Sequence, residues 1–262
     1  MNPAFGRCIE DVHRFLARME EKGRRIRETT APGNPRDSGL RSEPASIRGS
    51  AIVLKSDTFL ELGSPAWGSC VMTLYGEESE ARRGDRITLV GPDIEESPSS
   101  QLPFGQVVIV RGDALTDEDY SDLVHRRIAL QSLDGYMVRS TAGRIWSRIS
   151  HDAARNGFCF EILGAALIGR IKRQTARISS VEVAFVTSSA DDVAELRPIA
   201  ERAREASEAI KETVWRQRGV DIRSCGPGPH CGACDDEDTC LEIRKIGAER
   251  KRTAKSERAT TR

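Results

Sequence analysis

Four cysteines lie close together near the C-terminal end of the sequence. The segment from Ser224 reads Ser-Cys-Gly-Pro-Gly-Pro-His-Cys-Gly-Ala-Cys-Asp-Asp-Glu-Asp-Thr-Cys, which gives the spacing C-x5-C-x2-C-x5-C. A Cys-x-x-Cys pair lets two thiolates converge on one metal, and the Gly and Pro residues permit the turn that brings in the others. We therefore expect a metal site with the ligands Cys225, Cys231, Cys234 and Cys240.

The spacing alone leaves the kind of site open. Four thiolates suit either a [4Fe–4S] cluster or a tetrahedral zinc ion. Zinc sites usually show two tight cysteine pairs, whereas here one pair is flanked by two single cysteines, and this asymmetry favours iron–sulfur. Cys231 and Cys234 could instead form a redox dithiol, or the segment could be a loop whose cysteines bind nothing. His230 is expected to be exposed, although it could also serve as a ligand.

No other catalytic motif stands out. The sequence has no phosphate-binding G-x-x-x-x-G-K-[ST], no dinucleotide G-x-G-x-x-G after a strand, no G-x-S-x-G and no H-E-x-x-H. Its four histidines are scattered and support no catalytic triad. Cys8, Cys70 and Cys159 lie in apolar or helical contexts and are expected to be buried as small apolar side chains.

Composition and charge set the class of protein. The 262 residues are 38% apolar and carry 40 Lys+Arg against 40 Asp+Glu, as expected for a soluble globular protein rather than a generic nucleic-acid or membrane binder. No apolar run approaches the roughly 20 residues of a membrane-spanning helix. The N-terminus lacks a secretory signal, so we expect a cytoplasmic protein whose clustered thiols are metal ligands or redox groups rather than disulfides.

Hydrophobic periodicity and turn residues divide the chain into five parts. We expect an amphipathic helix over 1–27, a linker over 28–50, an α/β domain over 51–218, the cysteine segment over 219–246 and a disordered basic tail over 247–262.

Strand-like and helix-like runs alternate within the α/β domain. Strands are expected at 86–90, 106–110, 136–138, 144–149 and 181–186. Helices are expected near 116–133, after Ser150, at 160–171 and from 189 onward. Hairpin-length connections are mixed with crossovers, which predicts an α+β fold: a mixed sheet with helices packed mainly on one face, followed by the cysteine-rich metal loop.

A series of short motifs follows a fixed order through the central part of the chain. They are Glu61-Leu-Gly63, Ile87-Thr-Leu-Val-Gly-Pro-Asp-Ile94, Leu102-Pro-Phe-Gly105, Gly135-Tyr-Met137, Arg144-Ile-Trp-Ser-Arg-Ile-Ser150, Gly157-Phe158 and the strand at 181–187. In this order they resemble the β-subunit, the acetyl-CoA synthase subunit, of the carbon monoxide dehydrogenase/acetyl-CoA synthase complex. The likeness covers about residues 55–215.

The resemblance implies a metal centre and partners. In that family the matching region is a mixed α/β domain just before a nickel–iron–sulfur centre, which assembles acetyl-CoA from a corrinoid-carried methyl group, CO and CoA. It therefore favours a [4Fe–4S] cluster over zinc, adds nickel as a second metal, and implies a dehydrogenase or corrinoid-protein-like subunit as partner. The cysteine spacing departs from the family's, and the family's downstream Cys-Gly-Cys is missing from this sequence, so a complete dinickel site is hard to build on this chain alone.

The resemblance also implies a CoA contact near Trp146 and the arginines Arg139, Arg144 and Arg148. An indole face can stack on adenine while guanidinium groups pair with phosphates. The alternative is a strand whose tryptophan packs in the core and whose arginines face water. The sequence leaves both interpretations open.

Three functions follow. The first is an acetyl-CoA synthase-like iron–sulfur protein of one-carbon metabolism which, if catalytic, transfers an acyl or methyl group at a cluster-linked metal. The second is a non-catalytic iron–sulfur accessory or electron-transfer subunit that docks on a larger complex. The third is a structural zinc module.

Overall fold

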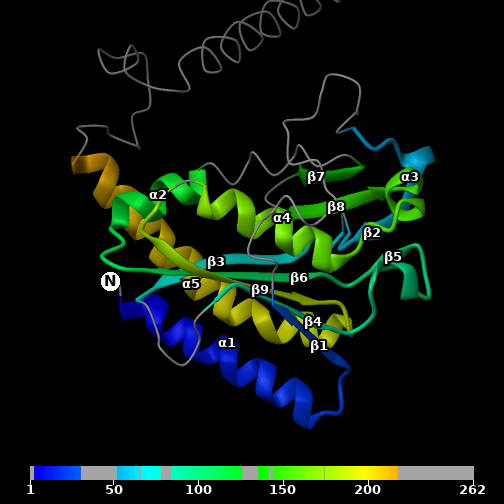
Figure 1. The fold of residues 1–262 in the computed structure, drawn as a ribbon, viewed down its shortest axis with the longest axis horizontal. Coiled ribbons are helices and arrows are strands. Elements are labelled where there is room, and N and C mark those ends of the chain that lie inside the picture. Colours follow the sequence, from blue (N-terminus) through cyan, green and yellow to red (C-terminus); the bar gives the residue numbers. More distant parts are fainter. Residues whose placement is uncertain are drawn as a thin grey trace, which may run out of the picture. The chain divides into compact units, whose positions relative to one another are not determined.

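The computed structural model describes residues 3–30, 52–64, 66–77, 84–125, 135–141, 144–173 and 175–217. The chain divides into one unit of residues 1–211 and a second of residues 212–262. The first unit contains two mixed β-sheets with helices packed on them (Figure 1). The predicted mixed α/β class is therefore confirmed, although the sequence did not reveal that the strands separate into two sheets.

The larger sheet has five strands in the order β1-β4-β9-β6-β3. Its strands are β1 (Ile26–Thr30), β3 (Cys70–Gly76), β4 (Arg86–Val90), β6 (Gly105–Gly112) and β9 (Ile178–Val186). The pairs β4–β9 and β3–β6 are parallel, whereas β1–β4 and β6–β9 are antiparallel. Every residue of β6 is buried, as expected for a strand covered on both faces.

The smaller sheet has four strands in the order β5-β2-β8-β7. Its strands are β2 (Thr58–Leu62), β5 (Gln101–Leu102), β7 (Tyr136–Thr141) and β8 (Arg144–Ser150). Strands β7 and β8, which the sequence predicted at 136–138 and 144–149, form an antiparallel hairpin, and β8 also pairs with β2. The candidate CoA residues all lie on this hairpin.

Helices cover both faces of the larger sheet. Helices α1 (Pro3–Glu21) and α5 (Ala190–Gln217) lie on one face, and α4 (Phe160–Lys172) lies on the other (Figure 1). Alternation along the strands explains this arrangement, because Gly105 in β6 faces Leu196 of α5, whereas Phe185 in β9 packs on Phe160 of α4 with ring centroids 4.9 Å apart. Two long helices thus share one face, and α4 adds a layer on the other.

The remaining helices are short. They are α2 (Asp117–His125), α3 (His151–Arg155) and the 3₁₀ helices η2 (Lys55–Asp57) and η4 (Ile94–Glu96). Ser150 caps α3 as predicted, because its Oγ accepts a hydrogen bond from the Ala153 N–H at 3.1 Å. In the described part of the chain every helix is too short or too polar to span a bilayer.

The N-terminal helix ends earlier than predicted. Gly23 has a φ of +69°, the Gly23 N–H donates to the Glu20 carbonyl, and the Arg24 N–H donates to the Met19 carbonyl. This is the glycine-terminated helix end in which the chain turns sharply away from the helix axis. The prediction of a helix to residue 27 and a linker from 28 is wrong here, since Ile26–Thr30 forms strand β1.

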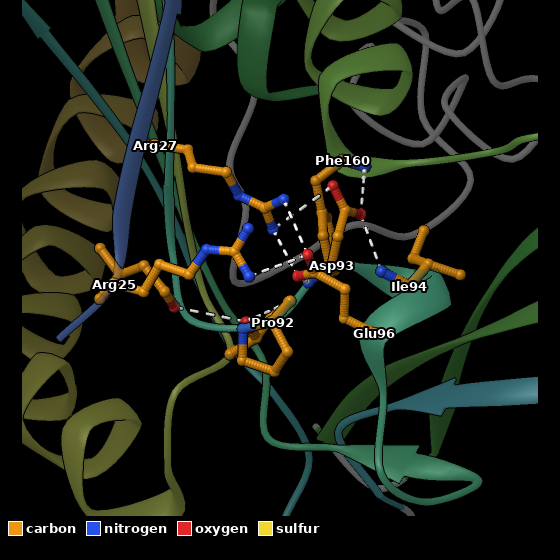
Figure 2. A network of polar contacts seen from close by, with 9 residues as sticks. Arg25, Arg27, Pro92, Asp93, Ile94, Glu96 and Phe160 are labelled. Carbon is orange, nitrogen blue, oxygen red and sulfur yellow. Dashed lines mark hydrogen bonds and ion pairs between the residues drawn. The ribbon is translucent and has the colours of Figure 1, made fainter.

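A polar network at the end of β4 joins four parts of the fold (Figure 2). Asp93 Oδ1 accepts hydrogen bonds from the Ile94 N–H at 2.7 Å and from the Phe160 N–H at 3.1 Å. Arg25 and Arg27 each place a guanidinium nitrogen 2.9 Å from a carboxylate oxygen of Glu96. The network therefore connects the start of β1, the end of β4, η4 and the first turn of α4.

Replacing Asp93 tests this network. The Asp93→Ala protein leaves the first N–H of α4 without its acceptor, since the preceding Cys159 provides no side-chain cap. We expect the free energy of unfolding to fall by about 1–2 kcal/mol, measured by urea denaturation with circular dichroism. Asp152→Ala is the matched control, because the Asp152 carboxylate is 81% exposed, and we expect a change within about 0.5 kcal/mol. Equal losses in the two proteins would contradict the capping role.

Candidate functional site

The predicted metal ligands lie outside the described residues. Cys225, Cys231, Cys234 and Cys240 fall within 218–262, together with His230 and the predicted basic tail. Within the part of the chain that the structure describes, no three His, Cys, Asp or Glu side chains are grouped so that they could hold a metal ion. The four-cysteine site therefore stays a prediction.

The other three cysteines are separated in the fold. Cys8 lies in α1, Cys70 begins β3 and Cys159 precedes α4. Cys8 and Cys70 are buried, as predicted, whereas Cys159 is only half-buried. Burial raises the pKa of all three thiols, that of Cys70 to about 11. They are therefore protonated near neutral pH, which is the wrong form for a metal ligand.

The candidate CoA residues lie on one hairpin of the smaller sheet. Trp146 in β8 pairs in register with Arg139 in β7, and Arg148 lies two residues further along β8. Because strand side chains alternate, Trp146 and Arg148 point to the same face of the sheet, which Arg139 shares. The structure therefore brings these three residues together, and Arg144 lies at the first position of β8 on that face.

The arginines on this face differ in their surroundings. Arg148 is part-buried, and its Nε donates to Glu61 Oε1 of β2 at 2.9 Å. Arg139 and Arg144 are exposed to solvent. Arg139 and Arg144 thus lie at the surface of this face, and Arg148 is paired with a carboxylate across the sheet.

Trp146 combines a packed ring with an unpaired polar atom. The side chain is only 5% exposed, so its ring faces are covered by protein. Its Nε1 is buried and has no hydrogen-bond partner among the described residues. An indole nitrogen can only donate, and leaving a buried donor unpaired costs about 1–3 kcal/mol. Packing explains the covered ring but not the unpaired N–H.

A second tryptophan, to which no sequence motif assigns a role, lies close to the smaller sheet in the chain. Trp67 lies in the turn between β2 and β3 and is 54% exposed. A turn-forming Ser-Pro-Ala-Trp-Gly segment between two strands is the signal that could have identified it. The next residue, Gly68, packs against Arg144 at the beginning of β8.

One cavity of about 330 Å³ lies at the carboxyl ends of β3 and β6. Its lining includes Tyr75, Gly112 and Ala114, and it carries the carboxylates of Glu77 and Asp113. Carboxylates repel phosphate groups, so this cavity is unsuited to CoA. The exposed arginines make the β7–β8 face the better candidate.

Comparison with known proteins gives a consistent family. The model of the CO dehydrogenase/acetyl-CoA synthase complex beta subunit matches residues 45–192. The carbon monoxide dehydrogenase/acetyl-CoA synthase subunit alpha of Moorella thermoacetica is 29% identical over 231 residues, which are 86% of this chain and 30% of that protein. The acetyl-CoA decarbonylase/synthase complex subunit beta of Methanopyrus kandleri is 30% identical over 158 residues, which are 58% of this chain and 32% of that protein. The chain thus spans about a third of the length of these curated relatives.

The raised pKa of the Cys70 thiol gives a test of whether this cysteine is buried in the core. At pH 8 Cys70 is almost entirely protonated, because burial raises its pKa to about 11, and alkylation requires the thiolate. We expect the Cys70 peptide to resist iodoacetamide in the native protein and to react after denaturation, as read by peptide mass spectrometry. Half-buried Cys159 is the internal comparison and should react first. Native labelling of Cys70 as fast as in the denatured chain would contradict its burial.

Proposed function

Because the chain belongs to the CO dehydrogenase/acetyl-CoA synthase complex beta subunit family, we propose that it is an acetyl-CoA synthase-like iron–sulfur protein of one-carbon metabolism. The observation that carries this proposal is the position of the family match. Residues 45–192 include both strands of the β7–β8 hairpin, and therefore the arginine-bearing face and the unpaired indole N–H of Trp146.

The β7–β8 face suits the anionic end of CoA. The exposed guanidinium groups of Arg139 and Arg144 pair with phosphate oxygens, as planar cations do. Trp146 lies on the same face, and its buried N–H would donate to an acceptor of the ligand once the side chains that cover it move, which would remove the cost of the unpaired donor. This differs from the stacking that the family resemblance implied, because the ring faces of Trp146 are covered. Arg148 stays with Glu61 and fixes β8 against β2.

The metal centre of the proposal rests on the cysteine spacing and the family. Cys225, Cys231, Cys234 and Cys240 would supply the four thiolates. A [4Fe–4S] cluster held by these cysteines would supply electron transfer, and a nickel ion held by soft thiolates would supply a metal for acyl or methyl transfer. A dehydrogenase or corrinoid-protein-like subunit is the proposed partner.

Two further functions remain candidates for specific reasons. The cysteine spacing C-x5-C-x2-C-x5-C departs from that of the family, which favours a non-catalytic iron–sulfur subunit for accessory or electron-transfer work. Four thiolates also suit a structural zinc ion. Metal content distinguishes all three.

The first test is metal analysis of the full chain purified without oxygen. We expect about four iron and four sulfide per chain, with the broad visible absorption of thiolate-to-iron charge transfer. The Cys231→Ser/Cys234→Ser protein should lose the iron, whereas Cys159→Ser, the matched control, should keep it, because Cys159 lies at the start of α4.

Each outcome selects one function. About one or two nickel per chain beside the iron supports a catalytic role, and iron without nickel supports the accessory role. About one zinc per chain and no colour would contradict both iron–sulfur functions.

The second test addresses the N–H of Trp146. Trp146→Phe keeps an aromatic ring in the core but removes the donor. We expect CoA affinity, measured by isothermal titration calorimetry, to fall roughly tenfold, the size of one hydrogen bond. The free energy of unfolding should change by less than about 1.5 kcal/mol, because removing an unpaired donor offsets the lost ring volume.

Two arginines provide the matched comparison. Arg139→Ala should also weaken CoA binding, whereas Arg155→Ala, a 75% exposed arginine of α3, should not. A Trp146→Phe protein that binds CoA as tightly as the wild type would remove Trp146 from the site.

A further inference from the structure

Residues 53–57, which we call the strap, cross the smaller sheet just before β2 begins. Thr58, the first residue of β2, pairs with β8, whereas the Val53 N–H donates to Met137 Sδ of β7 at 3.4 Å. Strand β8 lies between β2 and β7, so the strap has to pass β8 to reach from one to the other. Met137 pairs in register with Arg148, and the two side chains therefore lie on the same face of the sheet.

The strap is weakly attached to the hairpin of β7 and β8. Val53 is its single buried residue, at 1% exposure, whereas the four residues after it are exposed, Leu54 by 63%. The Asp57 N–H and the Thr58 hydroxyl both donate to the Leu54 carbonyl, at 3.1 and 2.8 Å, so these bonds hold the strap in shape without tying it to the hairpin. The bond from Val53 to the hairpin is accepted by a thioether sulfur, which is a weak acceptor. The strap can therefore turn about Thr58 as a unit, with the loss of one buried valine side chain and one weak hydrogen bond.

Two residues of β8 on that face carry hydrogen-bond donors that the described part of the chain does not use. The Arg148 side chain is 13% exposed, and its Nε alone is paired with a described residue, Glu61. Trp146, two residues earlier in β8, is 5% exposed, and its Nε1 has no partner among the described residues. Buried donors without partners cost free energy, so they are typical of a place that a ligand completes. The strap passes β8 on the face that holds these donors.

We propose that the strap is a movable cover of this face. It is closed in this structure, and it lifts from Met137 to expose the terminal nitrogens of Arg148 and the indole N–H of Trp146. Lifting disturbs little besides the contacts of Val53, because the other strap residues are already in water. A ligand with an anionic group then reaches donors that the closed strap keeps from it. The role in ligand entry rests on the proposed function, whereas the movement itself does not.

Acrylamide quenching of tryptophan fluorescence tests the movement on the full chain without any ligand. The Trp67→Phe/Trp215→Phe protein keeps Trp146 as its single tryptophan. In this background Val53→Ala weakens the buried anchor of the strap, and we expect it to raise the quenching constant of Trp146. Hydrogen exchange of the amides of residues 53–58 should become roughly tenfold faster, as for the loss of two buried methyl groups. Leu54→Ala is the matched control, because it removes an exposed side chain from the same segment, and it should change neither measurement.

A Val53→Ala protein in which Trp146 stays as protected as in its parent would overturn the inference. A loss of global stability in urea as large as the loss of local exchange protection would also overturn it, because Val53 would then belong to the common core. Stopped-flow binding of CoA addresses ligand entry: we expect faster association with Val53→Ala, and equal association rates would remove the strap from the path of the ligand. A wild-type protein that does not bind CoA would overturn the proposed function and not the strap, whose movement the fluorescence reports.

Discussion

The loop after β4 can lie against the loop after β9 only because residue 91 has no side chain. Gly91 has a φ of +113°, and a Cβ built on it would lie 2.5 Å from the Ser188 nitrogen. Thr187 closes the contact, because its N–H donates to the Val90 carbonyl at 2.8 Å and its hydroxyl to the Pro92 carbonyl at 2.7 Å. A side chain at this point would separate the two loops. The close approach fixes the position of Asp93, whose carboxylate then reaches the first turn of α4.

The two sheets are connected through the chain segments that pass between them. Strand β2 of the smaller sheet leads through the Trp67 turn into β3 of the larger sheet, and β5 leads through Phe104 into β6. The two connecting segments are hydrogen-bonded to each other where they begin, because the Gly63 N–H donates to the Leu102 carbonyl at 2.8 Å. Phe104 then packs on Phe160 of α4 with ring centroids 5.9 Å apart. Helix α4 therefore also packs on the segment that connects β5 of the smaller sheet to β6 of the larger sheet.

Local patterns predicted the strands with clear boundaries and missed those defined by distant partners. Strand β4 was predicted at its observed bounds, because a β-branched run precedes Gly91 and Pro92. Strand β1 was missed, since Ile26–Thr30 holds one large apolar residue and is defined by pairing with β4, some sixty residues away. For the same reason the sequence placed Trp146, Arg144 and Arg148 on one strand but left open whether the ring is covered and gave no indication of the unpaired N–H. The ordered motifs shared with the family located this face. Only the packing of segments distant in the sequence showed which of its side chains are exposed and which are buried.

Stability and recognition are separated between the two sheets. Helices cover both faces of the larger sheet, so its strands are buried and offer a ligand little surface. The hairpin of the smaller sheet instead keeps Arg139 and Arg144 in water, while the Arg148–Glu61 pair ties that hairpin to β2. Trp146 stays packed on this face, whereas the turn that carries the exposed Trp67 is fixed by hydrogen bonds from the Ala66 and Trp67 N–H groups to Ser64 Oγ. Under the proposed function, an anionic ligand would therefore meet the protein at this hairpin rather than at the larger sheet.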